Sequence, residues 1–210
     1  SLIWLVAGVS VGVISALRRG SVFDRGAMGT ALAGVSLPIF FTGLISLAFF
    51  SYRLRITAPG GTFVPFSENP AQWAYALLLP WITLAFLFSA QYARLTRAGM
   101  LETMSEDYIR TAESKGLTNR VIRGRHVLRN AMLPVTTTIG LQIGALLGGA
   151  VLTEAVFSWG GIGEALALSF SRRDYPVLQV IILAAAAVYV LVNLMVDIMY
   201  AVIDPRVRTR

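Results

Sequence analysis

Long apolar runs are the feature that most limits what this chain can fold into. They occur at roughly residues 1–17, 27–52, 73–97, 131–157 and 178–203. A hydrocarbon core of about 30 Å is crossed by about 20 helical residues, whereas a spanning β-strand needs only about 9–11 residues of alternating polarity. We therefore expect residues 1–210 to form a single transmembrane domain, an all-α polytopic membrane helix bundle with five spans.

The composition fits that expectation. The chain is 56% hydrophobic and 14% charged, whereas soluble domains carry about 25% charged residues. A net charge of +7 would suggest nucleic acid in a soluble protein, but membrane proteins concentrate Lys and Arg in cytoplasmic loops. We expect membrane lipid and no nucleic acid as partner. The lack of Cys excludes disulfides and Cys-ligated metal sites.

The distribution of Lys and Arg predicts the orientation. Fourteen of the 18 basic residues follow the first, third and fifth runs, and the other two connections hold only Arg53, Arg55, Arg172 and Arg173. Because positive loops are cytoplasmic, the C-terminus should be cytoplasmic and the start of this chain outside. One further upstream span would return the N-terminus to the cytoplasm, so we expect six spans in the full subunit.

Glycines at helical spacing predict close packing between spans. Gly8 and Gly12 form one GxxxG unit in the first run, and Gly140, Gly144 and Gly148 form two in the fourth. Small residues let helix backbones approach closely inside a membrane. Packing within one subunit is the main expectation, and a partner helix or a moving interface is the alternative.

A charged stretch, "DYIRTAESKGLTNRVIRGRHVLRNAMLP" (107–134), lies between the third and fourth runs. Its acids come first, and from Lys115 to Arg129 there are five positive residues and no acid. Acids suit the start of a helix, and Gly116 suits its end. Thr118 can then cap a second helix, so the stretch predicts two short cytoplasmic helices joined at a glycine.

The second of these helices should be amphipathic. A period of 3.6 residues predicts an apolar face of Leu117, Val121, Gly124 and Leu128 and a polar face of Asn119, Arg123, His126 and Asn130. A basic amphipathic helix either lies on anionic headgroups or docks into a groove of a partner protein. His126 has no second ligand or orienting acid nearby in the sequence, so we do not expect it to bind metal or act as a base.

The same stretch resembles the cytoplasmic "EAA" loop of the membrane subunits of bacterial ABC importers. Arg110, Thr111, Ala112 and Gly116 stand at the matching positions, and Leu133-Pro134 comes about five residues later than in the general pattern. The replacement of Glu-Ala-Ala by Arg-Thr-Ala and the later Leu-Pro are both typical of the dipeptide, oligopeptide and nickel permease branch. "GGAVLTEAVFSWGGIG", "RRDYPVLQ" and "NLMVDIMYAVIDPRVR" are similar to that branch too, with Gly160 where the branch usually has Pro.

The resemblance implies the transmembrane domain of a type I ABC importer in the bacterial inner membrane. It implies that a loop at about 98–130 couples the permease to cytoplasmic ATPase subunits. It also implies a second homologous permease subunit and an extracytoplasmic solute-binding protein, which would meet the outer connections 53–72 and 158–177. The expected coupling residues are Arg110, Thr111, Ala112, Glu113, Lys115, Gly116, Leu117, Thr118, Asn119, Arg120 and Arg123.

The chain lacks a GxxxxGK[ST] phosphate loop, so we expect no enzymatic activity or cofactor in it, and ATP with Mg on the partner ATPase subunits. The resemblance favours di- or oligopeptides as cargo moved by alternating access. A nickel or other small-solute importer is the alternative within the branch. An ATP-independent channel or sensor subunit is the alternative from another class.

Three side chains are candidates for the pathway or a gate. Asp197 is ionisable and lies inside the last run, where such groups are functional by default, although pairing with an Arg would be a structural alternative. Glu154 should lie near the outer end of the fourth run, where it would either hold the "FSWGGIG" loop or meet substrate. Trp159 belongs to that loop, and it is also expected to be an interfacial anchor, as are Tyr175 and Trp73.

Overall fold

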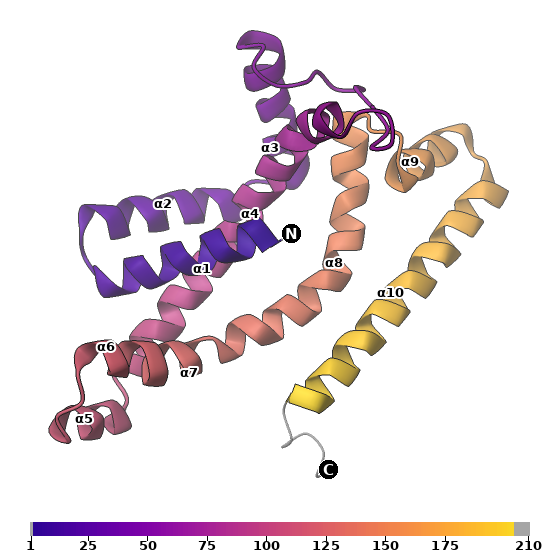
Figure 1. The fold of residues 1–210 in the computed structure, drawn as a ribbon. Helices are drawn as coiled ribbons and strands as arrows, with labels where there is room; N and C mark the ends of the chain where they lie inside the picture. Colours follow the sequence, from indigo (N-terminus) through magenta and orange to yellow (C-terminus); the bar gives the residue numbers. More distant parts are fainter. Residues whose placement is uncertain (1, 204–210) are drawn as a thin grey trace. The chain divides into compact units, whose positions relative to one another are not determined.

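The computed structural model describes residues 2–203, and every regular element in that range is helical (Figure 1). Side chains are described except at residues 2, 140, 141, 143–150, 196, 197 and 199–203. In chain order the elements are α1 (Leu2–Leu17), α2 (Val22–Ser36), α3 (Ile39–Ser46), the π-helix η1 (Leu47–Arg53), α4 (Pro70–Met104), α5 (Asp107–Ser114), α6 (Asn119–Val121), the π-helix η2 (Ile122–Leu128), α7 (Arg129–Ala131), α8 (Leu133–Phe157), α9 (Ile162–Arg172) and α10 (Tyr175–Ile203).

Two described helices are long and apolar enough to cross a membrane, namely α4 and the Tyr175–Met195 part of α10. The number rises to four if each of two bent helix pairs counts as one span, and α1 is an additional, shorter apolar helix. All five predicted apolar runs are therefore helical. By length and composition alone, however, the described residues supply two to four spans.

The second run is a broken helix. α2 begins at Val22, earlier than predicted, and ends at Ser36. Leu37 then takes an extended conformation, with φ −88° and ψ 131°, because the ring of a following proline disfavours helical backbone in the residue before it. Pro38 therefore separates α2 from α3, which starts at Ile39.

The chain divides into two compact units, and the first comprises Ser1–Pro38 and Ile82–Thr138. In this unit α1 packs against α4 through the predicted pair of glycines. A Cβ on Gly8 would lie 2.6 Å from the carbonyl oxygen of Ser89, and one on Gly12 would lie 2.6 Å from that of Ala93. No other residue type permits this approach, which confirms close helix packing within one subunit. The corresponding contacts of Gly140, Gly144 and Gly148 lie outside the described side chains.

The second unit comprises Ile39–Trp81 and Ile139–Arg210. A small core of Leu47, Leu79 and Phe157 joins η1, the start of α4 and the end of α8. The predicted outer connection 158–177 contains a helix that the sequence analysis did not anticipate, α9, which is bent by 81° from the last turns of α8. Trp73 packs edge-on against the rings of Phe66 and Trp81.

Candidate functional site

The charged stretch folds as two helical segments separated by a glycine turn, as predicted. α5 ends where the amide of Gly116 donates to the carbonyl oxygen of Glu113 (2.9 Å), and the second segment runs over residues 119–131. Gly116 has φ +75°, in the left-handed region that favours glycine. A Cβ at this position would meet no atom within 4 Å. Backbone conformation, and not lack of space, therefore requires glycine here.

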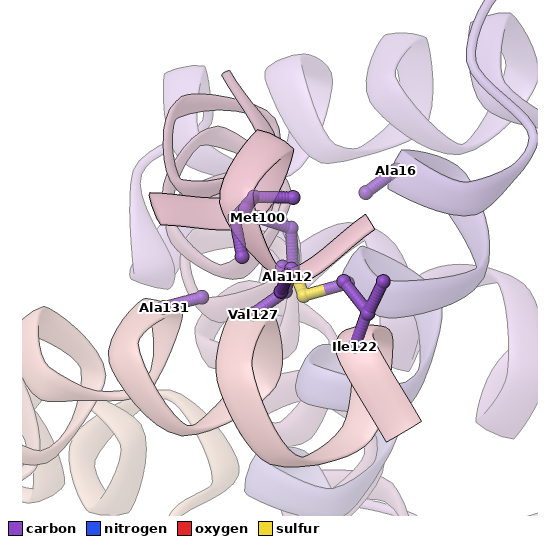
Figure 2. Close-up of a cluster of buried hydrophobic side chains, with 7 residues drawn as sticks. Ala16, Met100, Ala112, Ile122, Val127 and Ala131 are labelled. Carbon is purple, nitrogen blue, oxygen red and sulfur yellow. The ribbon is translucent and has the colours of Figure 1, made fainter. Parts of the chain in front are cut away.

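A buried apolar core fixes this stretch to two long helices (Figure 2). Met100 of α4 (1% exposed) and Val127 of η2 (0% exposed) are among its most buried members. The cluster combines residues of α1, α4 and both helical segments, and its members are Ala16, Met100, Ile109, Ala112, Ile122, Val127 and Ala131. The stretch is thus packed onto α1 and α4 and is not a loose connector.

The predicted apolar face of the second segment is only partly correct: of its members, Leu128 packs against the core. Ile122, Val127 and Ala131 are buried, whereas Val121 is 41% and Leu117 40% exposed. The prediction assumed 3.6 residues per turn, but residues 122–128 form a π-helix, whose i→i+5 hydrogen bonds widen each turn. Residues five apart, such as Ile122 and Val127, consequently lie on the same face.

Most of the predicted coupling residues are exposed. Ala112 is buried in the core, and the others are exposed: Arg110, Thr111, Glu113, Lys115, Gly116, Leu117, Thr118, Asn119, Arg120 and Arg123. Arg110 lies 3.6 Å from Asp107, but both side chains are more than three-quarters exposed, and such surface pairs contribute about 0–1 kcal/mol. Thr118 occupies the N-cap position with extended backbone, but its side chain makes no capping bond, so that predicted cap is absent.

The surface formed by these exposed residues, hereafter the coupling surface, is positively charged. Lys115, Arg120 and Arg123 form no ion pair with any residue that the structure describes. Asn130 of the predicted polar face donates to the hydroxyl oxygen of Tyr108 (2.6 Å), which joins the second segment to α5. The arrangement offers exposed donors and positive charge on a rigid support, which suits an acidic or polar partner groove.

The sequence analysis missed a buried ion pair in the same unit. Asp24 of α2 is 3% exposed, and Arg97 of α4 donates to both of its carboxylate oxygens, with Nε–Oδ1 2.6 Å and Nη2–Oδ2 2.8 Å. The hydroxyl of Ser15 (2.8 Å) and the amide of Gly20 (2.9 Å) also donate to Asp24. One carboxylate thus joins α1, the turn after it, α2 and α4. Its partner Arg97 lies three residues before Met100, a member of the buried core.

One local signal could have revealed this pair. Asp24 is the only acid among the first 67 residues, and a lone acid beside an apolar run needs a partner when it is buried. Nothing in the local sequence identifies Arg97 as that partner, because the two residues are 73 positions apart.

In the second unit Glu154 holds the turn between α8 and α9. Its Oε2 accepts from the amide of Gly163 (2.6 Å), and its carbonyl oxygen accepts from the amide of Trp159 (3.0 Å). A Cβ on Gly161 would overlap the Glu154 carboxylate, and one on Gly163 would overlap the backbone of Val151. This is the loop-holding arrangement that the sequence analysis gave as one of two roles for Glu154.

The other candidates of the outer turn are placed as follows. The ring of Trp159 lies edge-on to that of Phe63, with centroids 6.2 Å apart, and its buried Nε1 has no partner among the described residues. Gly160 has φ +20°, which a proline ring fixed near −65° cannot adopt, so this turn differs locally from one with Pro.

Asp197 belongs to α10, but its side chain lies outside the described set. The described residues contain no group of three or more His, Asp or Glu that could hold a metal.

Comparisons with known proteins show the family of this chain. The dipeptide transport system permease protein DppB of Escherichia coli K12 is 44% identical over 223 residues, covering 96% of this chain and 66% of its own length. The di/tripeptide transport system permease protein DppB of Pseudomonas aeruginosa is 46% identical over 220 residues, with the same coverage. The chain thus spans just under two thirds of the length of these relatives. The model of the family described as "Binding-protein-dependent transport system inner membrane component" matches residues 8–209, and the chain belongs to that family.

Proposed function

We propose that this chain is the membrane-spanning permease subunit of an ATP-driven ABC importer for di- and oligopeptides, with five spans in residues 1–210. The names of its relatives support the cargo class. The distribution of basic residues supports a cytoplasmic C-terminus and a cytoplasmic coupling surface. Substrate crosses by alternating access, and cytoplasmic ATPase subunits, which bind ATP and Mg, drive the closure.

The observation that carries the proposal is the packing of the charged stretch. Its outer side is exposed and positive, while its inner side is part of a core shared with α1 and α4. Well-packed apolar cores deform little. A force applied by an ATPase subunit to the coupling surface therefore displaces α4, a helix long and apolar enough to span the membrane.

The remaining partners follow from surfaces that the chain leaves uncovered. None of the residues in the Tyr175–Met195 window of α10 is buried, although the window is strongly apolar. Lipid and a second, homologous permease subunit would cover such a face. The turn between α8 and α9 and the loop 54–69 would meet the extracytoplasmic solute-binding protein.

The test compares two glycines that differ in one property. Neither Gly116 nor Gly124 would have an atom within 4 Å of an added Cβ, but only Gly116 has a positive φ. Gly116→Val should insert and fold, yet lose ATPase subunits on purification or lose transport per ATP hydrolysed, because valine disfavours the left-handed backbone. Gly124→Val, the control, should retain both.

Normal ATPase retention and normal transport per ATP in Gly116→Val would mean that the charged stretch is a connector and not the coupling element. Wild-type protein that purifies without ATPase subunits would favour an ATP-independent channel or sensor subunit. Equal losses in both variants would mean that bulk on this surface, and not the turn, is what matters. Nickel uptake without peptide uptake by the intact transporter would support the alternative cargo within the same branch.

A further inference from the structure

A groove with both apolar and polar lining residues lies beside α4 in the first unit. Gln91, Arg94, Leu95 and Ala98 of α4 line it together with Val35 of α2 and Thr138 of α8. Its volume is about 490 Å³, which falls within the roughly 300–1,000 Å³ typical of small-molecule sites. Gln91, Arg94 and Ala98 are three and four residues apart, so they share one face of the helix.

Arg94 is the only ionisable residue of this groove. It forms no hydrogen bond or ion pair with any residue that the structure describes. Arg97, one turn further along α4, is instead neutralised by Asp24. The two arginines of α4 thus differ in their contacts. Arg97 is paired with Asp24 inside the protein, whereas the guanidinium of Arg94 is available for a ligand.

The position of Arg94 along α4 limits what it can face. The 24 residues from Pro70 to Ala93 contain no Asp, Glu, Lys or Arg. At about 1.5 Å each they extend about 36 Å, slightly more than the hydrocarbon core of about 30 Å. Arg94 therefore lies at the inner end of this span in the proposed orientation. Ionisable residues at such positions face a water-filled cavity or the headgroups, and the groove provides such a cavity.

The groove matches the chemistry of a peptide terminus. A guanidinium binds a carboxylate with two parallel hydrogen bonds. The hydroxyl of Thr138 already donates to the carbonyl oxygen of Pro134 (2.8 Å), so its remaining lone pairs can accept a hydrogen bond. A peptide terminus supplies both partners, since a carboxylate accepts and the neighbouring amide N–H donates.

We propose that Arg94 binds the C-terminal carboxylate of the peptide cargo as it passes the inner end of α4, with Thr138 accepting from the adjacent N–H. This inference rests on the proposed peptide-permease function and adds a specific binding residue to it. The same oxyanion chemistry is present in a phospholipid headgroup, and the experiment separates the two sources.

The lack of Cys in this chain permits a test by chemical rescue in the complete transporter, reconstituted in vesicles with its binding protein. Arg94→Cys should lower uptake of a labelled dipeptide about tenfold, the size of effect expected from losing one hydrogen-bonded charge. Modification with 2-aminoethyl methanethiosulfonate, which restores a cation, should recover much of the uptake. Methyl methanethiosulfonate, which is neutral, should recover none.

Two controls accompany this test. Arg19→Cys, an exposed cation in the turn after α1, should transport normally with either reagent. Wild-type transporter treated with the same reagents corrects for cysteines of the partner subunits. If Arg94→Cys fails to assemble, Arg94→Lys replaces it and should raise the KM for uptake without lowering the maximal rate of ATP hydrolysis.

Four results would overturn the inference. They are normal uptake by Arg94→Cys, rescue by the neutral reagent, an unchanged KM in Arg94→Lys, and a defect that appears only in vesicles with phosphatidylglycerol and is absent with zwitterionic lipid. The last result would assign the site to a headgroup phosphate. Failure of the untreated wild-type transporter to take up dipeptide would instead contradict the proposed function.

Discussion

Gly116 lies in the turn after α5 and Gly163 lies in the first turn of helix α9, but they are glycine for different reasons. Gly116 has φ +75° and open space around it. Gly163 has no positive φ, yet a Cβ there would overlap the backbone of Val151 and lie 3.0 Å from the carboxylate of Glu154. Backbone conformation requires glycine at position 116, and packing requires it at position 163.

This difference separates two kinds of loop. The Gly116 turn leaves its surroundings empty and its flanking residues exposed, so another protein can approach it. The connection of residues 158–161 and the start of α9 are held by the Glu154 side chain, so we expect them to keep a fixed shape whether or not a partner is present. We therefore expect substitutions in the Gly116 turn to affect coupling, and substitutions at Gly163 to affect folding.

The largest effect is expected for Gly163→Val. Because the atoms that it would overlap are backbone, they cannot move aside as a side chain can, and overpacking of this kind costs about 3 kcal/mol or more. The yield of folded protein and its thermal transition in detergent should both fall sharply. Gly26→Val, where an added Cβ has no neighbour within 4 Å, should change neither, and similar losses in the two variants would refute the packing argument.

A smaller effect is expected when the Glu154 contact is removed. Glu154→Ala leaves the Gly163 amide without its acceptor and should reduce stability by about 1–3 kcal/mol. Glu154→Gln keeps an acceptor oxygen at the same place and should lose less. Thermal unfolding of both variants measures the difference. A transport defect in Glu154→Gln with normal stability would show that the carboxylate also meets cargo, which the loop-holding role alone does not predict.

The sequence predicted the helices better than their contacts. Uninterrupted apolar residues determine where a membrane helix can form, and Gly116 after an acidic turn determined where α5 ends. The break at Leu37–Pro38 follows from proline sterics. α9 was missed because its 11 residues lie in a segment that was interpreted only as an outer connection.

The candidate site was only partly predictable. The glycine turn at Gly116 was located correctly along the chain, but the predicted apolar face of the second helical segment was wrong in part because a π-helix shifts the register. The Asp24–Arg97 pair was missed because its two members are 73 residues apart. Position along one helix can be deduced from local sequence, whereas pairing between helices depends on tertiary packing that no short pattern encodes.

The smallest effects are expected from alanine at two glycines of the charged stretch. Gly116→Ala must adopt the left-handed backbone, at a cost of about 1–2 kcal/mol. Gly124→Ala adds a better helix former to the second helical segment, a gain of up to about 1 kcal/mol. Because the Cβ has open space at both positions, no packing difference obscures the comparison. Amide hydrogen exchange of residues 107–131 should therefore be faster in the first variant and slower in the second.

Amide hydrogen exchange of the α1 and α4 residues that meet at Gly8 and Gly12 is the internal reference for this pair of variants. It should be the same in both proteins, because the substitutions lie at the exposed surface and not in the core formed with Met100. Faster exchange there in Gly116→Ala would show that strain in the turn reaches the long helices even without an ATPase subunit. That result would contradict the distinction drawn above, because substitutions at Gly116 would then affect folding, as those at Gly163 are expected to do.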